Sequence, residues 1–328
     1  MALIAKEFRG KIEDLHHYGH IVVVDTEGNI LRQVGNPYQM VYSRSSAKPM
    51  QAIPVIESGA ADKYKITDNE LAVMCASHTG EKFHEEAVLS ILKKIGLDEG
   101  YLQCGTHRPF TNLVADKFIT ESRKWGNIHN NCSGSHAGML ATALIQQEDL
   151  NTYCDITHPV QKRVVDTIAN MCSYPADKIV IGIDGCGVPV HALPLYKFAQ
   201  GYAKMSDKTN AGKAVKRITK AMTSYPEMVG GTEDFTSELM QAFGDKMFCK
   251  YGSNAFFAIG LVDKGIGIAM KIESGRADVI PLIVLELLVQ INEITEEESD
   301  NLPSFKQDTL KIRRNHRGEE ASRIVTTF

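Results

Sequence analysis

The sequence predicts a mixed α/β protein of the α+β type, in which both ends of the chain build one antiparallel sheet and a mainly helical lobe is inserted between them. Two observations indicate this. Strand-like alternation of apolar and polar residues occurs near the N-terminus and again after residue 246. Residues 67–245 instead show helical periodicity punctuated by Gly and Pro. We therefore expect residues 1–60 and 246–328 to form a sheet lobe with flanking helices, and residues 61–245 to form the helical lobe of one compact unit.

The N-terminal part combines a hairpin and a helix. Residues 20–34 alternate around the turn Glu27-Gly28-Asn29, which is typical of a β-hairpin. Residues 45–59 are helical from their first turn, where Pro49 is tolerated because the first N–H groups of a helix lack partners anyway. Pro54 is expected to kink or shorten this helix.

The rest of the chain supplies the remaining elements. We expect a short buried strand over residues 179–183 and helices over residues 81–95, 135–147, 159–171, 211–224 and 234–243. Strand character returns over residues 247–250 and 255–271, with a turn at Asp263-Lys264-Gly265. A long apolar helix over residues 276–293 and a last strand over residues 322–327 follow.

The composition narrows the classes of function. The 328 residues are 43% hydrophobic and 23% charged, which fits one large domain or two lobes with a sizeable core. A net charge of −4 without long basic blocks argues against nucleic-acid binding. No run of 18 apolar residues exists, so we expect no membrane-spanning segment. Seven cysteines, an odd number, and no export signal predict free thiols and a cytoplasmic location.

The tetrapeptide Ser45-Ser46-Ala47-Lys48 follows the N-terminal hairpin. Its first and last residues, Ser45 and Lys48, lie three positions apart and therefore share one helical face. A serine becomes a nucleophile when a base takes its proton, and a lysine kept neutral by burial or by a second cation can do so. The start of a helix also stabilises negative charge. A solvated Ser/Lys pair is the alternative, because this spacing is common.

The position of the tetrapeptide, between a terminal sheet and a helical lobe, is similar to that in the serine β-lactamase and penicillin-binding-protein fold. The signature of that fold is S-x-x-K, then a serine in the helical lobe, then Lys-x-Gly on a strand. Lys250-Tyr251-Gly252 takes the third place here, and Ser77 and Ser133 are candidates for the second.

Five segments carry a more specific resemblance. They are residues 44–51 (RSSAKPMQ), 76–81 (ASHTGE), 130–140 (NNCSGSHAGML), 184–189 (DGCGVP) and 250–252 (KYG). Their order and their amino-acid sequences resemble those of the L-asparaginase II family of the Rhizobium type. The resemblance extends from Arg9-Gly10 to the segment at residues 315–318. The resemblance implies hydrolysis of L-asparagine to L-aspartate and ammonia, and a homodimer.

The same resemblance implies two serine–lysine pairs, Ser45 with Lys48 and Ser77 with Lys250. Ser45 would be the nucleophile, Lys48 its base, and the second pair a relay that carries a proton to the departing ammonia. The structural alternatives are a helix cap for Ser77 and a solvated strand lysine for Lys250.

The family also binds zinc through two cysteines and a lysine. The cysteines correspond to Cys132 and Cys186, but Ser135 stands at the place of the lysine. Two thiolates are a poor closed zinc site, because tetrahedral zinc takes four ligands or three and a water. Neighbouring His136 would project from a different face. Zinc is therefore a candidate ligand that the mechanism does not require, and two reduced cysteines are the alternative.

Four residues are candidates for contact with substrate. Arg44 could clamp the α-carboxylate or form a structural salt bridge. Asp184 could orient a site group, bind the substrate amine or simply make a turn. His78 follows Ser77 directly, and Asn254 stands in Gly-Ser-Asn-Ala where the family usually has Gly-Ala-Glu-Gly. The lost acid at Asn254 removes a negative charge near Lys250 and loosens recognition of the α-amino group.

Two other functions stay open at the level of sequence. Glutamine or another ω-amide could be the substrate, because one methylene changes discrimination by only about 1–3 kcal/mol. A catalytically silent protein that holds an amino acid or a metal through Cys132 and Cys186 is also compatible with the departures at Ser135 and Asn254.

Overall fold

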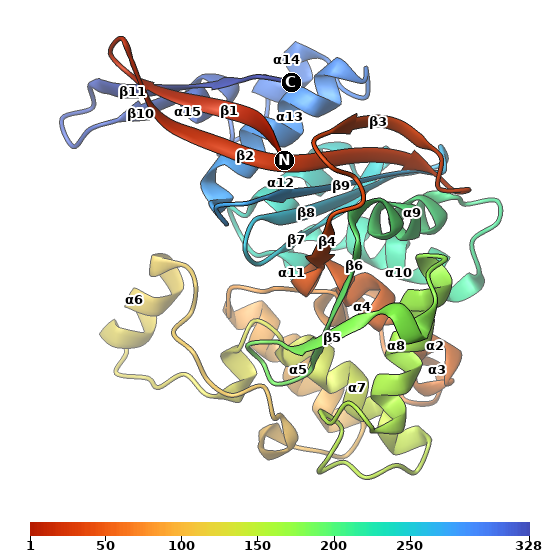
Figure 1. The fold of residues 1–328 in the computed structure, drawn as a ribbon. Coiled ribbons are helices and arrows are strands. Elements are labelled where there is room, and N and C mark those ends of the chain that lie inside the picture. Colours follow the sequence, from red (N-terminus) through yellow and green to blue (C-terminus); the bar gives the residue numbers. More distant parts are fainter.

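The large sheet is built from both ends of the chain. The computed structural model describes the backbone of residues 1–328 and every side chain except those of residues 307 and 308. The sheet has eight strands: seven pair in the order β10-β11-β1-β2-β9-β8-β7, and the eighth, β3, pairs with β2 beside this path (Figure 1). All of these pairings are antiparallel. The predicted fold class is therefore confirmed. The bounds are β1 Ala2–Arg9, β2 Ile12–Asp25, β3 Ile30–Val34, β7 Met247–Gly252, β8 Phe256–Leu261, β9 Ile266–Ile272, β10 Ile312–Arg314 and β11 Glu320–Thr326.

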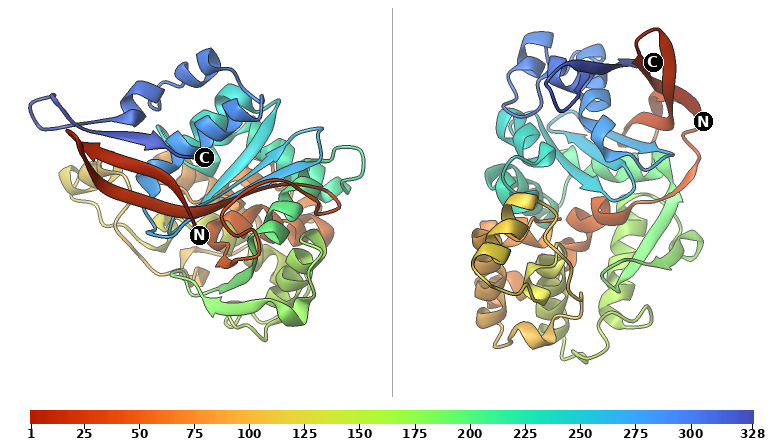
Figure 2. Two further views of the ribbon diagram at one scale, coloured as in Figure 1. Left: turned by 45° about the horizontal axis from the view of Figure 1, so that its top comes forward. Right: turned by 90° about the vertical axis from the view of Figure 1, so that its left-hand side faces the viewer.

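The strand β1 and the first half of β2 were not expected from the sequence. They form a ribbon that turns at Gly10, whose φ of 59° lies in the left-handed region. Residues 12–16 of β2 are exposed, and the polar residues Glu13, Asp14 and His16 among them interrupt the hydrophobic pattern of a strand. The two chain ends meet here, because β1 pairs with β11 and both termini lie beside the sheet (Figure 2).

A second sheet has three short strands, ordered β4 (Met40–Tyr42), β6 (Pro189–Pro194) and β5 (Val180–Ile183). The prediction of a buried strand over residues 179–183 is wrong in one respect. β5 lies at an edge, and Ile183 is 83% exposed. An apolar run predicted burial, but this strand pairs on one side alone. β4 and β6 were not predicted.

The helices between the sheets largely follow the predicted ranges. The α-helices of the described backbone are α1 Lys48–Gln51, α2 Ile53–Glu57, α3 Ala60–Lys63, α4 Asp68–Met74, α5 Lys82–Lys94, α6 Asn112–Thr120, α7 Ser133–Ile145, α8 Pro159–Met171, α9 Leu195–Ser206, α10 Lys213–Ser224, α11 Pro226–Val229, α12 Phe235–Phe243, α13 Ile280–Gln290, α14 Glu296–Asp300 and α15 Gln307–Lys311. The helix expected over residues 45–59 is divided. A 3-10 turn, η1 (Arg44–Ala47), leads into α1, and Pro54 lies in the first turn of α2.

Two helices show how the sheet is covered. α9 packs against β2, β8 and β9, although its residues fall in the range predicted for the helical lobe. Gly267 of β9 permits this contact, because a Cβ there would lie 1.9 Å from the carbonyl oxygen of Ala199. α13 is shorter than predicted, and its apolar residues are buried in the core of the single chain. The division into two lobes stays a prediction.

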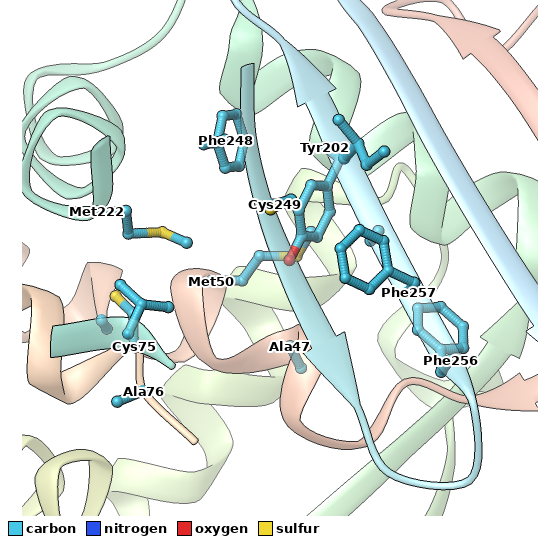
Figure 3. Close-up of a cluster of buried hydrophobic side chains, with 14 of the residues drawn as sticks. Ala47, Met50, Cys75, Ala76, Tyr202, Met222, Phe248, Cys249, Phe256 and Phe257 are labelled. Atoms are coloured by element: carbon cyan, nitrogen blue, oxygen red, sulfur yellow. The ribbon is translucent and has the colours of Figure 1, made fainter. Parts of the chain in front are cut away.

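A cluster of buried side chains lies where the sheet meets the helices. Ala47 and Met50 pack in it together with Tyr202 from α9, and Tyr202 stacks on Phe248 of β7 with ring centroids 5.3 Å apart (Figure 3). This cluster fixes the start of α1 against β7. None of the helices in the described part of the chain is both long enough and apolar enough to cross a bilayer.

Candidate active site

The segment that carries Ser45 is held by hydrogen bonds to two sheets. Ser46 Oγ donates to the carbonyl of Lys250 on β7 (2.8 Å), and the Tyr202 hydroxyl donates to the carbonyl of Ser46 (2.8 Å). Ser43 donates through N and Oγ to the carbonyl of His191 on β6, at 3.1 Å each. Arg44 has a φ of +50°, an uncommon conformation for a residue with a side chain. The surrounding contacts therefore hold η1 in a strained geometry between the sheets.

The amine of Lys48 is buried among acceptors from two other segments. It donates to the carbonyls of Ala76 (2.5 Å) and Asn131 (3.3 Å) and lies 3.5 Å from Ser77 Oγ and 3.2 Å from Cys132 Sγ. Within the described part of the chain, the Ser45 hydroxyl has no hydrogen-bond partner. Lys48 therefore shares a helical face with Ser45 while its amine is directed toward Ser77 and Cys132.

Ser77 is the meeting point of the two lysines. Lys250 Nζ donates to Ser77 Oγ at 2.9 Å, and Lys48 Nζ lies 3.5 Å from the same oxygen. The backbone N–H of Ser77 donates to Val229 O (3.0 Å), which fixes the segment after α4. The neighbours of Ser77 are buried, but Ser77 itself is half-exposed. The structure thus brings the sequence-predicted residues Lys48, Ser77 and Lys250 together.

Lys250 is a buried amine with a perturbed acidity. Its side chain is 1% exposed, and burial, followed by the positive charge of Lys48, lowers the pKa of Lys250 to about 7. The carboxylate of Asp234 acts in the opposite direction and limits this shift. An amine with a pKa near neutrality can both accept and return a proton at physiological pH, which suits a general acid or base.

Two cysteines lie near the amine of Lys48. The Cys186 thiol donates a hydrogen bond to Cys132, and this bond, together with Lys48, lowers the pKa of Cys132 to about 6 despite its burial. The resulting negative charge and burial raise the pKa of Cys186. The Cys132 sulfur, whose pKa is lowered, thus lies 3.2 Å from the Lys48 amine.

Arg44 and Asp184 pair with each other. Arg44 Nη2 and Nε donate to Asp184 Oδ1 at 2.6 and 3.0 Å, and the same oxygen accepts from the N–H of Gly185 (2.7 Å). The side chains are 24% and 16% exposed. The salt bridge considered as the alternative role for Arg44 is thus present, and it ties η1 to the loop after β5.

His78 connects the Ser77 segment to Ser133 by hydrogen bonds. Its Nδ1 accepts from the N–H of Gly80 (3.1 Å), so Nε2 carries the proton and donates to Ser133 Oγ (2.8 Å). Its ring stacks on that of His84 with centroids 4.8 Å apart. Burial, the largest cause, lowers the pKa of His78 well below its ordinary value. His78 is therefore a neutral histidine held by three neighbours, and it does not line the cavity described next.

A cavity of about 700 Å³ opens beside Ser77. Ser77 and Asn131 line it together with Tyr251 of β7 and Asn254 of the loop that follows β7. Asn254 has a φ of +61°, which asparagine tolerates better than most residues. Of the predicted site residues, Ser77 and Asn254 face this cavity.

Comparison with known proteins identifies the family. Residues 5–325 match the sequence profile described as L-asparaginase II. The chain belongs to the L-asparaginase II family. A search of curated protein sequences gives no match.

Solved structures similar to this L-asparaginase II family member are distant. One is a β-lactamase from Mycobacterium bovis, with 10% identity and a TM-score of 0.44 over 83% of this chain and 94% of the other. A second is the protein Mglu, with 11% identity and a TM-score of 0.41 over 84% of this chain and 67% of the other.

The zinc site implied by the resemblance does not fit the residues of this family member. Ser135 donates its hydroxyl to the carbonyl of Cys132 (2.8 Å), and it therefore offers no third ligand. The cation of Lys48 occupies the contact with Cys132 that a metal would need. No group of three or more His, Cys, Asp or Glu side chains in the described part of the chain is arranged for a metal. We therefore derive no chemical step through zinc.

Two site residues of this family member were missed at the sequence level. Asn131 contributes the carbonyl that accepts from Lys48, and its side chain lies at the cavity. Asp234 influences Lys250 while capping α12, through N–H groups of Thr236 (2.9 Å) and Ser237 (3.3 Å). Its position at the start of a predicted helix signalled the cap, but no sequence signal placed it near Lys250.

Proposed function

We propose that this protein hydrolyses the side-chain amide of L-asparagine and releases L-aspartate and ammonia. The observation that carries the proposal is the connected set Lys48, Ser77 and Lys250 beside a cavity, in a chain whose family acts on amides. The lysine at the end of this set has a pKa of about 7, so it can exchange protons near neutral pH.

In the proposed mechanism, Lys48 first passes a proton to the Cys132 sulfur, 3.2 Å away, and becomes neutral. Ser45 Oγ then attacks the amide carbon and its proton passes to Lys48. Lys48 lies 3.5 Å from Ser77, and Ser77 accepts from Lys250 at 2.9 Å, so a proton can be delivered along this set to the departing nitrogen. The C–N bond then breaks and ammonia leaves. Water next attacks the Ser45 ester and regenerates the serine with release of aspartate. Backbone N–H groups that hold the oxyanion would contribute about 3 kcal/mol each.

A specific observation favours a second assignment of the nucleophile. Ser77 lines the cavity and receives the hydrogen bond of the lysine with lowered pKa, whereas the Ser45 hydroxyl makes no hydrogen bond to either lysine in the described part of the chain. In this alternative, Lys250 takes the proton of Ser77 and the acyl group is carried by Ser77. Both assignments predict the same reaction and differ in the serine that becomes esterified.

Ammonia release from asparagine, from glutamine and from small peptides, with zinc or with a chelator, tests the function. We expect Ser45→Ala to lower turnover by orders of magnitude while the circular-dichroism spectrum stays unchanged. Ser274→Ala is the matched control, because Ser274 is exposed and does not line the cavity. Near-normal activity of the Ser45→Ala protein would refute its role as nucleophile.

Mass spectrometry of acid-quenched enzyme separates the two nucleophiles, because an acyl adduct on a peptide with Ser45 or with Ser77 identifies the esterified side chain. If the protein releases no ammonia from any amide but binds asparagine in calorimetry, it is a silent binding protein and the proposed function is wrong.

A further inference from the structure

The cavity beside Ser77 is larger than free asparagine requires. Its volume is about 700 Å³. Pockets of about 300–1,000 Å³ bury most of the surface of a drug-sized ligand. A small amino acid with its amide at Ser77 would leave most of this volume unfilled.

The chemistry of the wall is mainly apolar. Aromatic and aliphatic side chains from four segments contribute to it, namely Phe110, Phe257, Ile280, Pro281, Phe305 and Leu310. Phe235 connects two of them, with ring centroids 5.6 Å from Phe257 and 5.1 Å from Phe305. Burying an apolar group against such a wall lowers the free energy of the complex.

The cation of the described wall is already paired. Arg313 is the cation among the described lining residues, and its guanidinium lies 2.8 Å from Asp278. Arg44, the other candidate for an α-carboxylate, is paired with Asp184 and does not line the cavity. A carboxylate placed in this cavity would therefore meet no free cation in the described part of the chain.

We propose that the preferred substrates are amides that carry an apolar group, aromatic or aliphatic, which occupies this cavity while the amide carbonyl lies at the serines. The proposal rests on the amidohydrolase function proposed above and specifies its substrate class. The reaction is unchanged: the C–N bond breaks, the acyl group passes to serine, the amine leaves with the delivered proton, and water cleaves the ester.

Three substrates test the proposal and locate the apolar group. L-asparagine has none, Nα-phenylacetyl-L-asparagine carries it on the acyl side, and L-aspartic acid β-anilide carries it on the leaving amine. We expect kcat/KM for one of the two extended amides to exceed that for asparagine by about tenfold or more, as burial of one aromatic ring provides. Equal or lower values for both would overturn the proposal.

Variants of the wall provide the second readout. Ala277 is exposed and lines the cavity, so Ala277→Trp fills it, and Phe110→Ala removes an apolar surface that is 64% exposed. Both should lower the ratio of kcat/KM for the extended amide to that for asparagine. Ile119→Ala is the matched control, because Ile119 is 61% exposed on the neighbouring α6 and does not line the cavity. An unchanged ratio in Ala277→Trp would overturn the proposal.

Failure of the proposed function gives a different result from failure of the substrate class. If no amide is hydrolysed, binding of Nα-phenylacetyl-L-asparagine to the intact protein is measured by calorimetry. Tighter binding than that of asparagine, lost in Ala277→Trp, supports the apolar subsite even in a silent protein. Binding no tighter than that of asparagine overturns it.

Discussion

Lys250 combines burial with contact to a reactive hydroxyl. Its amine lies 2.9 Å from Ser77 Oγ, and burial with the nearby charge of Lys48 lowers its pKa to about 7. Lowering the pKa of an amine means that the neutral form persists at a lower pH than in a free lysine. Lys250 can thus act as a base in the neutral range, where an ordinary lysine is fully charged.

We expect the rate of amide hydrolysis to rise with pH through about 7, because neutral Lys250 accumulates above that value. The pH profile of kcat/KM on asparagine or on its extended amides measures this limb. In Asp234→Asn, the loss of a carboxylate that raises the pKa of Lys250 should move the limb to lower pH. A limb that does not move would contradict the assignment to Lys250.

Ser135 determines whether a metal ion can bind beside the two cysteines. The Cys132 sulfur is paired with Lys48 at 3.2 Å, and Ser135 directs its hydroxyl to a carbonyl instead of toward the sulfurs. The partner of the Cys132 sulfur is thus the Lys48 amine and not a metal ion.

Ser135→Lys should therefore introduce zinc binding, because it restores the lysine that the family places three residues after the first cysteine. Metal analysis of purified protein dialysed against zinc measures the change, with Ser135→Ala as control. We expect substoichiometric zinc in the natural protein and in Ser135→Ala. A full equivalent of zinc in the natural protein would contradict the mismatch described above.

At the scale of elements, the approach of α9 to β9 depends on a missing side chain. Gly267 lies so close to α9 that a Cβ would reach 1.9 Å from Ala199 O and 2.5 Å from Ala203 N. Backbone atoms of a helix cannot move aside locally, so any side chain at residue 267 separates the helix from the sheet.

Gly267→Ala should lower the free energy of unfolding by about 3 kcal/mol, at the upper end of typical overpacking costs. Urea unfolding followed by circular dichroism measures the change. Gly185→Ala is the control, because a Cβ at Gly185 would meet no atom within 4 Å. Equal stability of the two variants would show that α9 does not pack as described.

The elements differ in how well the sequence predicted them. β7, β8 and β9 were predicted because each is an apolar run bounded by turn residues, and the sheet buries them. The ribbon of β1 and β2 was missed because its exposed part carries charged residues such as Glu13 and Asp14. β5 was predicted to be buried because its residues are apolar, and the sequence does not show that the strand lies at the edge of its sheet.

At the scale of the molecule, the two pairs of catalytic candidates come from distant parts of the chain. Ser77 and Lys250 are 173 residues apart and meet because α4 delivers one and β7 the other. The resemblance to the family also implies an association of whole chains. The apolar helix α13 is largely buried within one chain and does not supply the surface for it.

We expect the protein to sediment as a homodimer with twice the 36.2 kDa mass of one chain, in keeping with the family. Sedimentation equilibrium over a range of protein concentrations measures the mass. A single species of 36.2 kDa at all concentrations would contradict the expectation.

The sequence by itself determined the fold class, the family and the identity of the serine and lysine candidates, because these depend on periodicity and on local motifs. Only the tertiary structure decided which groups touch. It directed the Lys48 amine to Ser77 and Cys132, joined Arg44 to Asp184, and enclosed an apolar cavity beside Ser77. The physical reason is that hydrogen bonds, ion pairs and cavities arise between segments far apart in the chain, where burial and geometry set the partners.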